Sequence, residues 1–169
     1  MQAQSLFTGG IPMLFYGDEV GYTNDYSYLN DPGKSYDNRW MHRPVIDWAK
    51  NDRINIPGTT EQRIFQGTQR LIRLRKKCIA FSDYNNLTWL TPYNVHVASF
   101  IRSLYQQRLF CLFNYSSEPA PVTWYAFKEK GNAPSRLYDH WEEQFYEVGE
   151  DNAYFVAAPY QFYIFEAIN

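Results

Sequence analysis

The hydrophobic pattern of this 169-residue chain changes its period once, near Ala80. Between Thr59 and Lys77, before that point, apolar residues recur every three or four positions. This spacing places them on one face of an amphipathic helix, so we expect a single helix over 59–77. After Ala80 the period falls to two, the spacing of side chains that share one face of a β-strand. The sequence therefore predicts a helix followed by an all-β region.

The predicted helix carries signals at both ends. Thr59 and Gln62 fit a capping box, in which a hydroxyl and an amide bond to the free backbone N–H groups of the first turn. Basic residues gather near the other end, where the helix dipole favours cations. These are Arg70, Arg73, Arg75, Lys76 and Lys77. We interpret them as a solvated face and not as a nucleic-acid patch, because no aromatic residues are interleaved and the net charge is −2.

The region after Ala80 contains short segments rich in aromatic and β-branched residues, separated by polar turns. Strands are expected over 87–90, 95–102, 108–115, 121–127, 135–138, 144–148, 154–157 and 161–167. Hairpins are expected around Leu104–Gln107 and Trp141–Glu143. Many short strands at regular spacing indicate an antiparallel sandwich, with a domain boundary between residues 81 and 82.

Near the amino terminus, a short apolar run from Ile11 to Tyr16 ends abruptly at Gly17. Such a run, bounded by turn residues, is typical of a parallel strand buried on both faces. A long polar and aromatic loop follows, from Val20 to Pro44. In parallel sheets and barrels, active sites lie on the loops that follow the strands. The loop is therefore the expected functional segment.

These residues also carry a family resemblance. The pattern Gly-x-Pro-x-x-x-x-Gly-x-Glu, from Gly10 to Glu19, resembles the last barrel strand of the alpha-amylase superfamily, glycoside hydrolase family 13. Within the superfamily, the chain most resembles the amylosucrases. That likeness rests on Gly17-Asp18-Glu19-Val20-Gly21, Asn24-Asp25, Lys34-Ser35, Arg39-Trp40-x-His42-Arg43-Pro44, Phe65-Gln66-Gly67 and Pro159-Tyr160-Gln161.

The resemblance implies an α+β fragment of a longer protein. Residues 1–81 would be the last strand, active-site loop and last helix of a (β/α)8 TIM barrel, and residues 82–169 the carboxyl-terminal antiparallel β-sandwich. A complete barrel takes about 250 residues, so this chain holds only its end. An unpaired barrel strand would invite the fragment to associate with itself.

The resemblance also implies a retaining enzyme with two carboxyl groups roughly 5 Å apart. In the family, these and a third aspartate come from upstream strands, so no catalytic residue is expected here and the fragment should be inactive. The parent would be a sucrose-dependent glucosyltransferase with sucrose and α-glucan as substrates, needing no cofactor and no metal. One alternative is an α-glucosidase, α-amylase or sucrose hydrolase. Another is a non-catalytic carbohydrate-binding sandwich with a planar row of aromatics, for which candidates are Trp124, Tyr125, Tyr138, Trp141, Tyr146 and Tyr163.

Arg39 is the expected substrate-binding residue. In the family, the matching arginine pairs with an aspartate from another loop, closes the glucose pocket and touches the bound glucosyl unit. A guanidinium suits this role because it binds a carboxylate in two-pronged geometry. The other residues of the signature are expected to anchor the loop: Asp18, Glu19, Trp40, His42 and Arg43. Asp18 and Glu19 are poor candidates for a catalytic pair, because neighbours at a strand end point in opposite directions.

The sequence shows no metal-binding pattern. The loop residues Asn24, Asp25, Asn30, Asp31 and Asp37 lack the spacing of a calcium loop and are expected to be solvated. His42, His96 and His140 show no ligand spacing, and Cys78 and Cys111 are expected to be buried free thiols.

Composition gives little sign of a charged partner. With 16 basic and 18 acidic residues, nothing suggests nucleic acid or an anionic membrane, and no apolar run has the length of a membrane span. The first residues show no signal-peptide pattern, which favours the cytoplasm and otherwise leaves the compartment open.

Overall fold

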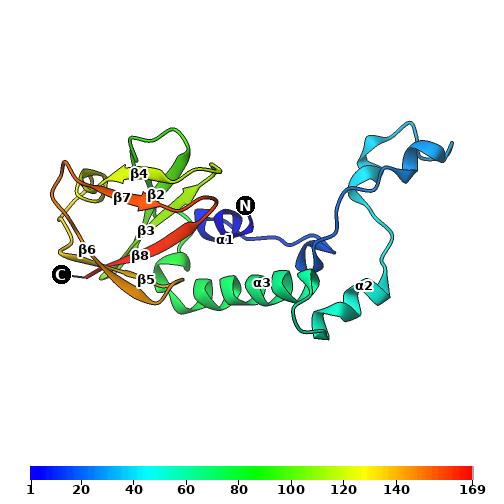
Figure 1. Cartoon of the computed structure of the whole chain (residues 1–169), viewed down its shortest axis with the longest axis horizontal. Coiled ribbons are helices and arrows are strands. Elements are labelled where there is room, and N and C mark those ends of the chain that lie inside the picture. Colours follow the sequence, from blue (N-terminus) through cyan, green and yellow to red (C-terminus); the bar gives the residue numbers. More distant parts are fainter. Residues whose placement is uncertain (169) are drawn as a thin grey trace. The chain divides into compact units, whose positions relative to one another are not determined.

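The computed structural model describes residues 1–168 and contains two compact units (Figure 1). The first unit consists of residues 1–12 together with the chain from residue 71 onward, and the second consists of residues 13–70. The boundary predicted between residues 81 and 82 concerns the domains of a longer protein and stays a prediction. Within this chain, residues 1–12 and 71–81 pack with the sheet of the first unit.

The first unit is built on antiparallel strands, as the period of two predicts. Its larger sheet has the order β1 (Leu87–Trp89), β2 (Val97–Leu104), β3 (Gln107–Asn114), β8 (Phe162–Ile168), β5 (Arg136–Asp139) and β6 (Gln144–Glu147). A smaller sheet pairs β4 (Ala120–Thr123) with β7 (Tyr154–Ala157). The predicted hairpins are confirmed. In the β2–β3 hairpin, Leu104 pairs with Gln107, and Tyr105 takes a positive φ of 53°, as tight hairpin turns require.

One predicted strand is too long. The segment expected over 121–127 leaves the sheet after Thr123 and continues as the 3-10 helix η6 (Trp124–Phe127). The helical turn brings both Trp124 and Phe127 into the core between the sheets, where they contact each other. An extended strand would separate two residues three apart onto opposite faces. The packing of these two rings therefore overrides the strand preference.

Both faces of the larger sheet are covered. On one face, residues such as Phe110 and Phe165 pack against the smaller sheet and η6. On the other face, Leu109, Cys111 and Ile164 pack against α1 (Gln2–Thr8), η5 (Ile79–Phe81) and the end of α3 from Leu71 onward, where α3 is Thr60–Lys77. Figure 1 shows α1, in dark blue, beside this sheet. The helices are therefore part of the core of this unit.

A buried arginine holds these helices to the sheet. The guanidinium of Arg102, on β2, is fully buried and donates to the carbonyls of Phe7 and Thr8 at 2.7 and 2.9 Å. It also donates to the carbonyl of Asp83 and to the side chain of Asn86. The carbonyls at the end of α1 carry partial negative charge, which suits a cation that has no carboxylate partner among these acceptors. Arg102 thus joins α1, the 83–86 segment and β2.

The helix predicted over 59–77 is confirmed as α3. The backbone N–H of Gln62 donates to the Thr59 hydroxyl at 3.2 Å, as the capping box predicts. The returning amide oxygen of Gln62 accepts from the Gly58 N–H at 2.9 Å, one residue earlier than the ideal motif. The predicted start at residue 59 therefore differs from the observed start of α3 by one residue.

The strand predicted over Ile11–Tyr16 is not formed, and the barrel remnant is not confirmed. Residues 11–15 have no regular structure, and the side chains of Ile11 and Met13 are exposed. A parallel barrel strand bonds to a neighbour on each side, and its hydrogen bonds come entirely from those neighbours. This chain supplies no such neighbours among its described residues, so the run stays irregular.

The second unit consists of short helical turns joined by loops. These are η1 (Asp18–Val20), η2 (Ser27–Asn30), η3 (Asn38–His42), α2 (Trp48–Asp52) and η4 (Arg53–Asn55). Gly17 and Gly21 flank η1 with φ of 92° and 69°. A Cβ on Gly21 would lie 2.4 Å from the Ile64 side chain, and one on Gly17 would lie 2.7 Å from the Tyr22 ring. Both positions require glycine.

Candidate functional site

The loop that the sequence singled out forms a pocket within the second unit. The pocket has a volume of about 290 Å³ and is lined by Phe15, Tyr16, Asp18, Tyr22, Thr23, Asn24, His42 and Pro44. Aromatic rings provide flat apolar surface, while a carboxylate, an amide and an imidazole provide hydrogen-bonding groups. Such a lining suits a small polar ligand with one apolar face.

The two adjacent carboxylates at the start of the loop bond to their own backbone. Asp18 Oδ2 accepts from the N–H of Phe15 at 3.0 Å, and Glu19 Oε2 accepts from the N–H of Gly17 at 2.9 Å. Each carboxylate closes a local turn. An anchoring role in the loop stays a prediction for both residues.

Arg39 forms a two-pronged ion pair with Asp37. Its Nε lies 2.9 Å from Asp37 Oδ1 and its Nη2 lies 2.7 Å from Asp37 Oδ2. Asp37 also caps η3 by accepting from the Arg39 backbone N–H at 3.0 Å. The Arg39 side-chain hydrogen bonds lower the pKa of Asp37 to about 2, so the carboxylate is ionised at any ordinary pH.

The Arg39 side of the ion pair is open to solvent, whereas the Asp37 side chain is 16% exposed, and Arg39 is not among the residues that line the pocket. Its side chain is 74% exposed. An exposed pair of this kind contributes little to stability. The guanidinium can therefore leave Asp37 for another acceptor at small cost. Within this chain, the carboxylate partner of Arg39 is Asp37 of the same loop, whereas the family resemblance implies an aspartate from another loop.

Two cations of the same loop lie close to the Trp40 ring. Lys34 Nζ is 5.2 Å and Arg43 Cζ is 5.4 Å from the Trp40 ring centroid, within the range of cation–π attraction. His42 Nδ1 lies 3.1 Å from Asn24 Oδ1, and this contact joins the two ends of the loop at the pocket. Anchoring roles for Trp40, His42 and Arg43 stay a prediction.

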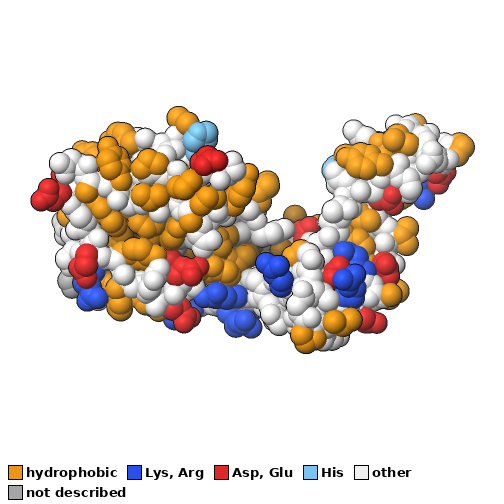
Figure 2. Space-filling model, in the orientation of Figure 1, with side chains coloured by type: hydrophobic (Ala, Val, Ile, Leu, Met, Phe, Trp, Pro, Cys, Tyr) orange, Lys and Arg blue, Asp and Glu red, His pale blue; other side chains and the backbone are white. Residues whose placement is uncertain are grey.

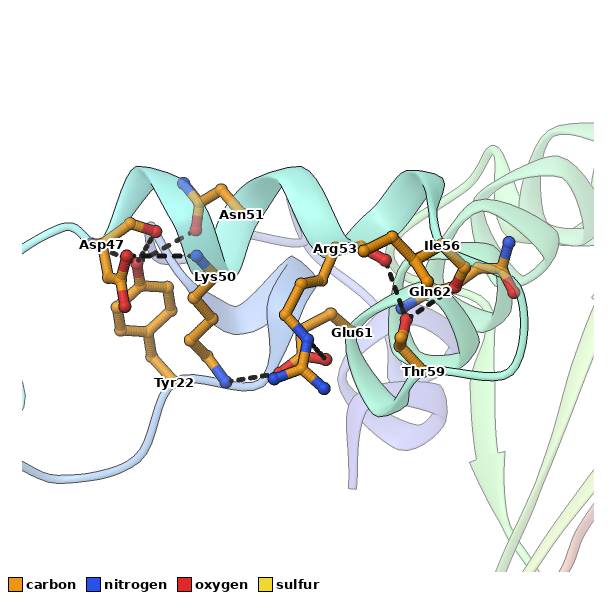
Figure 3. A network of polar contacts seen from close by, with 9 residues as sticks. All are labelled: Tyr22, Asp47, Lys50, Asn51, Arg53, Ile56, Thr59, Glu61 and Gln62. Atoms are coloured by element: carbon orange, nitrogen blue, oxygen red, sulfur yellow. Dashed lines mark hydrogen bonds and ion pairs between the residues drawn. The ribbon is translucent and has the colours of Figure 1, made fainter.

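A buried glutamate, which the sequence analysis did not single out, holds the other side of the unit together (Figure 3). Glu61, in the first turn of α3, pairs with Lys50 Nζ at 3.0 Å and with Arg53 Nε at 3.2 Å. The backbone N–H of Glu61 and the Lys50 ammonium lower the pKa of its carboxyl. The sequence signal that could have identified Glu61 is its position as an acidic residue in the first turn of a predicted helix.

Tyr22 joins this network to the pocket. Its hydroxyl accepts from the Asp47 N–H at 2.6 Å and donates to Asn51 Oδ1 at 3.0 Å (Figure 3). Lys50 Nζ lies 5.6 Å from the centre of the Tyr22 ring. The pocket wall formed by Tyr22 is therefore held by α2, and α2 is held by Glu61.

The six aromatics proposed for a binding row do not form one. Trp124 and Tyr163 are buried in the core between the sheets, and Tyr138, Trp141 and Tyr146 are half-buried. Tyr125 alone among the six is exposed. A carbohydrate-binding surface on this sandwich would need other residues.

The described part of the chain holds no cluster of three His, Cys, Asp or Glu side chains arranged to bind a metal ion. No helix within residues 1–168 is long and apolar enough to cross a bilayer. Cys78 and Cys111 are buried free thiols, as predicted. Burial raises the pKa of Cys78 to about 12, so its thiol is protonated and unreactive at neutral pH.

Comparison with known proteins identifies the fold. No family model matches the chain, but solved structures do. AmyP in complex with maltotriose aligns with 98% of this chain at 14% identity and a TM-score of 0.69. A mutant isomaltulose synthase from Erwinia rhapontici NX5, bound to its natural substrate sucrose, aligns with 98% at 16% identity and a TM-score of 0.62. Trehalose-6-phosphate hydrolase from Bacillus licheniformis aligns with 99% at 16% identity and a TM-score of 0.62.

These neighbours are enzymes of the alpha-amylase family. The present fold is that of their carboxyl-terminal region, a small α+β structure dominated by antiparallel sheet. The chain spans 34%, 37% and 39% of the three neighbouring chains, or about a third of their length.

Proposed function

We propose that this chain is the carboxyl-terminal part of a longer retaining enzyme that acts on α-glucosides, and that the parent is a sucrose-dependent glucosyltransferase of the amylosucrase type. The fold likeness supports an α-glucoside-active parent. The sucrose specificity rests on the loop signature around Arg39 and Trp40. A neighbour crystallised with sucrose is consistent with it.

The observation that carries the proposal is the exposed, two-pronged pair of Arg39 and Asp37 on a loop fixed by its own contacts. In the parent, one upstream carboxylate attacks the glucosyl carbon of sucrose while another protonates the departing fructose. The covalent glucosyl unit then passes to a hydroxyl of an α-glucan. Arg39 takes part by leaving or sharing Asp37 and donating N–H groups to a second carboxylate and to sugar hydroxyls. Arg39 is therefore proposed as a substrate-binding residue.

The loop contacts give Arg39 a fixed starting position. Trp40, in contact with Lys34 and Arg43, and His42, bonded to Asn24, restrict the backbone on the carboxyl side of Arg39. Asp37 restricts it on the amino side through the η3 cap. Positioning of this kind lowers the barrier because less freedom is lost when the substrate is cleaved.

The test is a pair of substitutions in the parent enzyme. Arg39→Ala should lower kcat on sucrose about a hundredfold or more, because orientation of the cleaved sugar is lost. Arg39→Lys should recover little activity, since an ammonium cannot form the planar two-pronged contact. The midpoint of thermal unfolding should change by no more than a few degrees, because the ion pair is exposed.

Arg73→Ala, at a solvent-exposed arginine on α3, is the matched control and should be fully active. The isolated chain should release neither glucose nor fructose from sucrose. Near-normal turnover by the Arg39→Ala parent would reduce this residue to a loop anchor.

A hydrolase acting on sucrose or another α-glucoside is the second candidate. It is favoured by the likeness to trehalose-6-phosphate hydrolase, whose TM-score equals that of the sucrose-bound neighbour. Product analysis separates the two candidates: a transferase lengthens an added α-glucan, whereas a hydrolase yields free glucose in equal amount to fructose.

A further inference from the structure

The ring of Tyr22 is held by contacts on three sides. It packs so closely on Gly17 that a Cβ there would lie 2.7 Å from it. Its hydroxyl is bonded to Asp47, the N-cap of α2, and to Asn51 within α2. The ammonium of Lys50, also on α2, lies 5.6 Å from the ring centroid, within the range of cation–π attraction. The position of Tyr22 is therefore set largely by α2.

Lys50 is held in turn by the buried carboxylate of Glu61. The Glu61 side chain is 6% exposed, and a carboxylate this deeply buried is costly unless cations satisfy it. Lys50 and Arg53 both do so, but only Lys50 also contacts Tyr22. In Figure 3, Lys50 lies between Tyr22 and Glu61, and Arg53 lies farther from Tyr22. The two cations thus share one partner and differ in what else they touch.

The loop that carries Arg39 begins directly after Tyr22. A backbone hydrogen bond joins the two ends of this loop, since the N–H of Asp25 donates to the carbonyl of Met41 at 2.8 Å. The His42 side chain adds a second link between the same ends. A displacement of Tyr22 is therefore passed to the backbone that follows Arg39.

The links from Glu61 to this loop form one continuous set of contacts. Every link joins residues between 17 and 61 and lies within the second unit. If the buried charges served only to attach α2 to α3, apolar side chains of similar volume would do so with no loss of stability. A charged pair adds a restriction that apolar packing lacks, because the ammonium has to stay beside the carboxylate.

We propose that the Glu61–Lys50 ion pair positions the loop of Arg39, with both members acting through Tyr22. The link to a reaction rests on the proposed function of the parent. The pair keeps Lys50 against the Tyr22 ring, Tyr22 fixes the start of the loop, and the contacts between the loop ends fix the backbone after Arg39. Arg39 then has little freedom left to lose when it meets the substrate.

The test compares two substitutions in the parent that each remove one cation from Glu61. Lys50→Met removes the ammonium beside Tyr22 and leaves the pair with Arg53. Arg53→Met is the matched control, because it removes the other cation and leaves the contacts of Lys50 in place. Methionine retains an unbranched apolar stem in both variants. The Lys50 and Arg53 side chains are 29% and 52% exposed, so we expect both variants to fold.

The kinetic result should separate the two variants. With sucrose, kcat/KM should fall about tenfold for Lys50→Met and stay within about twofold for Arg53→Met, measured well below the unfolding midpoint of each. Glu61→Gln keeps the shape of the side chain and removes its charge, so it should reproduce the loss seen for Lys50→Met. Equal kcat/KM for Lys50→Met and Arg53→Met would overturn the proposal.

Hydrogen exchange of the full-length parent gives a readout that needs no catalysis. Peptides that cover residues 22–43 should exchange faster in Lys50→Met and at an unchanged rate in Arg53→Met. An ion pair that only attached α2 to α3 would speed exchange in residues 47–62 and leave residues 22–43 unchanged in both variants. That second pattern would contradict a positioning role.

A double-mutant cycle tests the route through Arg39. If Lys50 acts through Arg39, adding Lys50→Met to the Arg39→Ala parent should lower kcat/KM by less than about twofold. A full tenfold loss in that background would show that the ion pair acts on another part of the site, and the proposal would fail.

These measurements separate the proposal from the proposed function. Full activity of the Arg39→Ala parent would remove the reaction from this loop, and faster exchange of residues 22–43 in Lys50→Met would still establish that the ion pair positions it. Loss of activity in Arg39→Ala together with normal kcat/KM in Lys50→Met would leave the proposed function intact and overturn the positioning role.

Discussion

Replacing Arg102 by alanine tests whether the buried guanidinium holds the first unit together. The side chain bonds to two carbonyls at the end of α1, to the Asp83 carbonyl and to Asn86. A hydrogen bond to a charged group contributes about 1.5–3 kcal/mol. The sum of these hydrogen-bond contributions over all the acceptors is an upper bound on the destabilisation. The exposed part of the 83–86 segment forms hydrogen bonds to water when the guanidinium is removed. Removing the guanidinium also leaves buried carbonyls without a partner, and each unsatisfied buried acceptor costs about 1–3 kcal/mol, so we expect a destabilisation of about 3–5 kcal/mol.

For a chain of this length, each kcal/mol lowers the midpoint of thermal unfolding by about 2–4 °C. Arg102→Ala should therefore lower the midpoint by roughly 10 °C or more, measured by calorimetry or circular dichroism. Hydrogen exchange should also speed up at the amides of α1, because its carboxyl-terminal anchor is gone. Arg102→Lys should recover only part of the loss, since one ammonium cannot reach acceptors on both segments.

Arg108→Ala is the matched control on the neighbouring strand. The guanidinium of Arg108 is only partly buried and donates to the carbonyls of Asn132 and Lys130 at 2.6 and 3.1 Å. Its loss should cost about 1 kcal/mol. A midpoint for Arg102→Ala within about 2 °C of the unchanged chain would refute the reasoning.

Two further predictions concern association and pH. Hydrophobic side chains appear on the surface of the 13–70 unit in Figure 2, and Met13 is 84% exposed in the apolar run Ile11–Tyr16. We expect the isolated chain to associate with itself through this run. The Met13→Asp substitution should shift the chain toward monomer in sedimentation velocity. An unchanged sedimentation profile would argue against association through this run. Burial raises the pKa of Asp139 to about 6 from an ordinary value of 3.8, so the folded state binds the proton more tightly than the unfolded state. Asp139 therefore makes stability fall as pH rises from about 4 to about 6, and Asp139→Asn should remove this part of the pH dependence in denaturant titrations; identical profiles would contradict the assignment.

The sequence by itself determined the elements whose signal is local. Among the described residues, the period of two located each strand of the two sheets, although it made β4 too long, and the helical period with Thr59 and Gln62 located α3. Both patterns depend only on neighbouring residues. The loop signature located the segment that forms the pocket of Tyr22 and His42, although it gave no geometry.

Tertiary structure decided everything that depends on residues far apart in the chain. Ile11–Tyr16 has the composition of a strand but forms none, because a strand needs partners that the composition cannot supply. Arg102 and Phe7 are 95 positions apart, and Asn114 and Ala157 are 43 apart, so no local pattern could announce either contact. Periodicity records which face of an element is buried; which segment covers that face is decided when the whole chain packs.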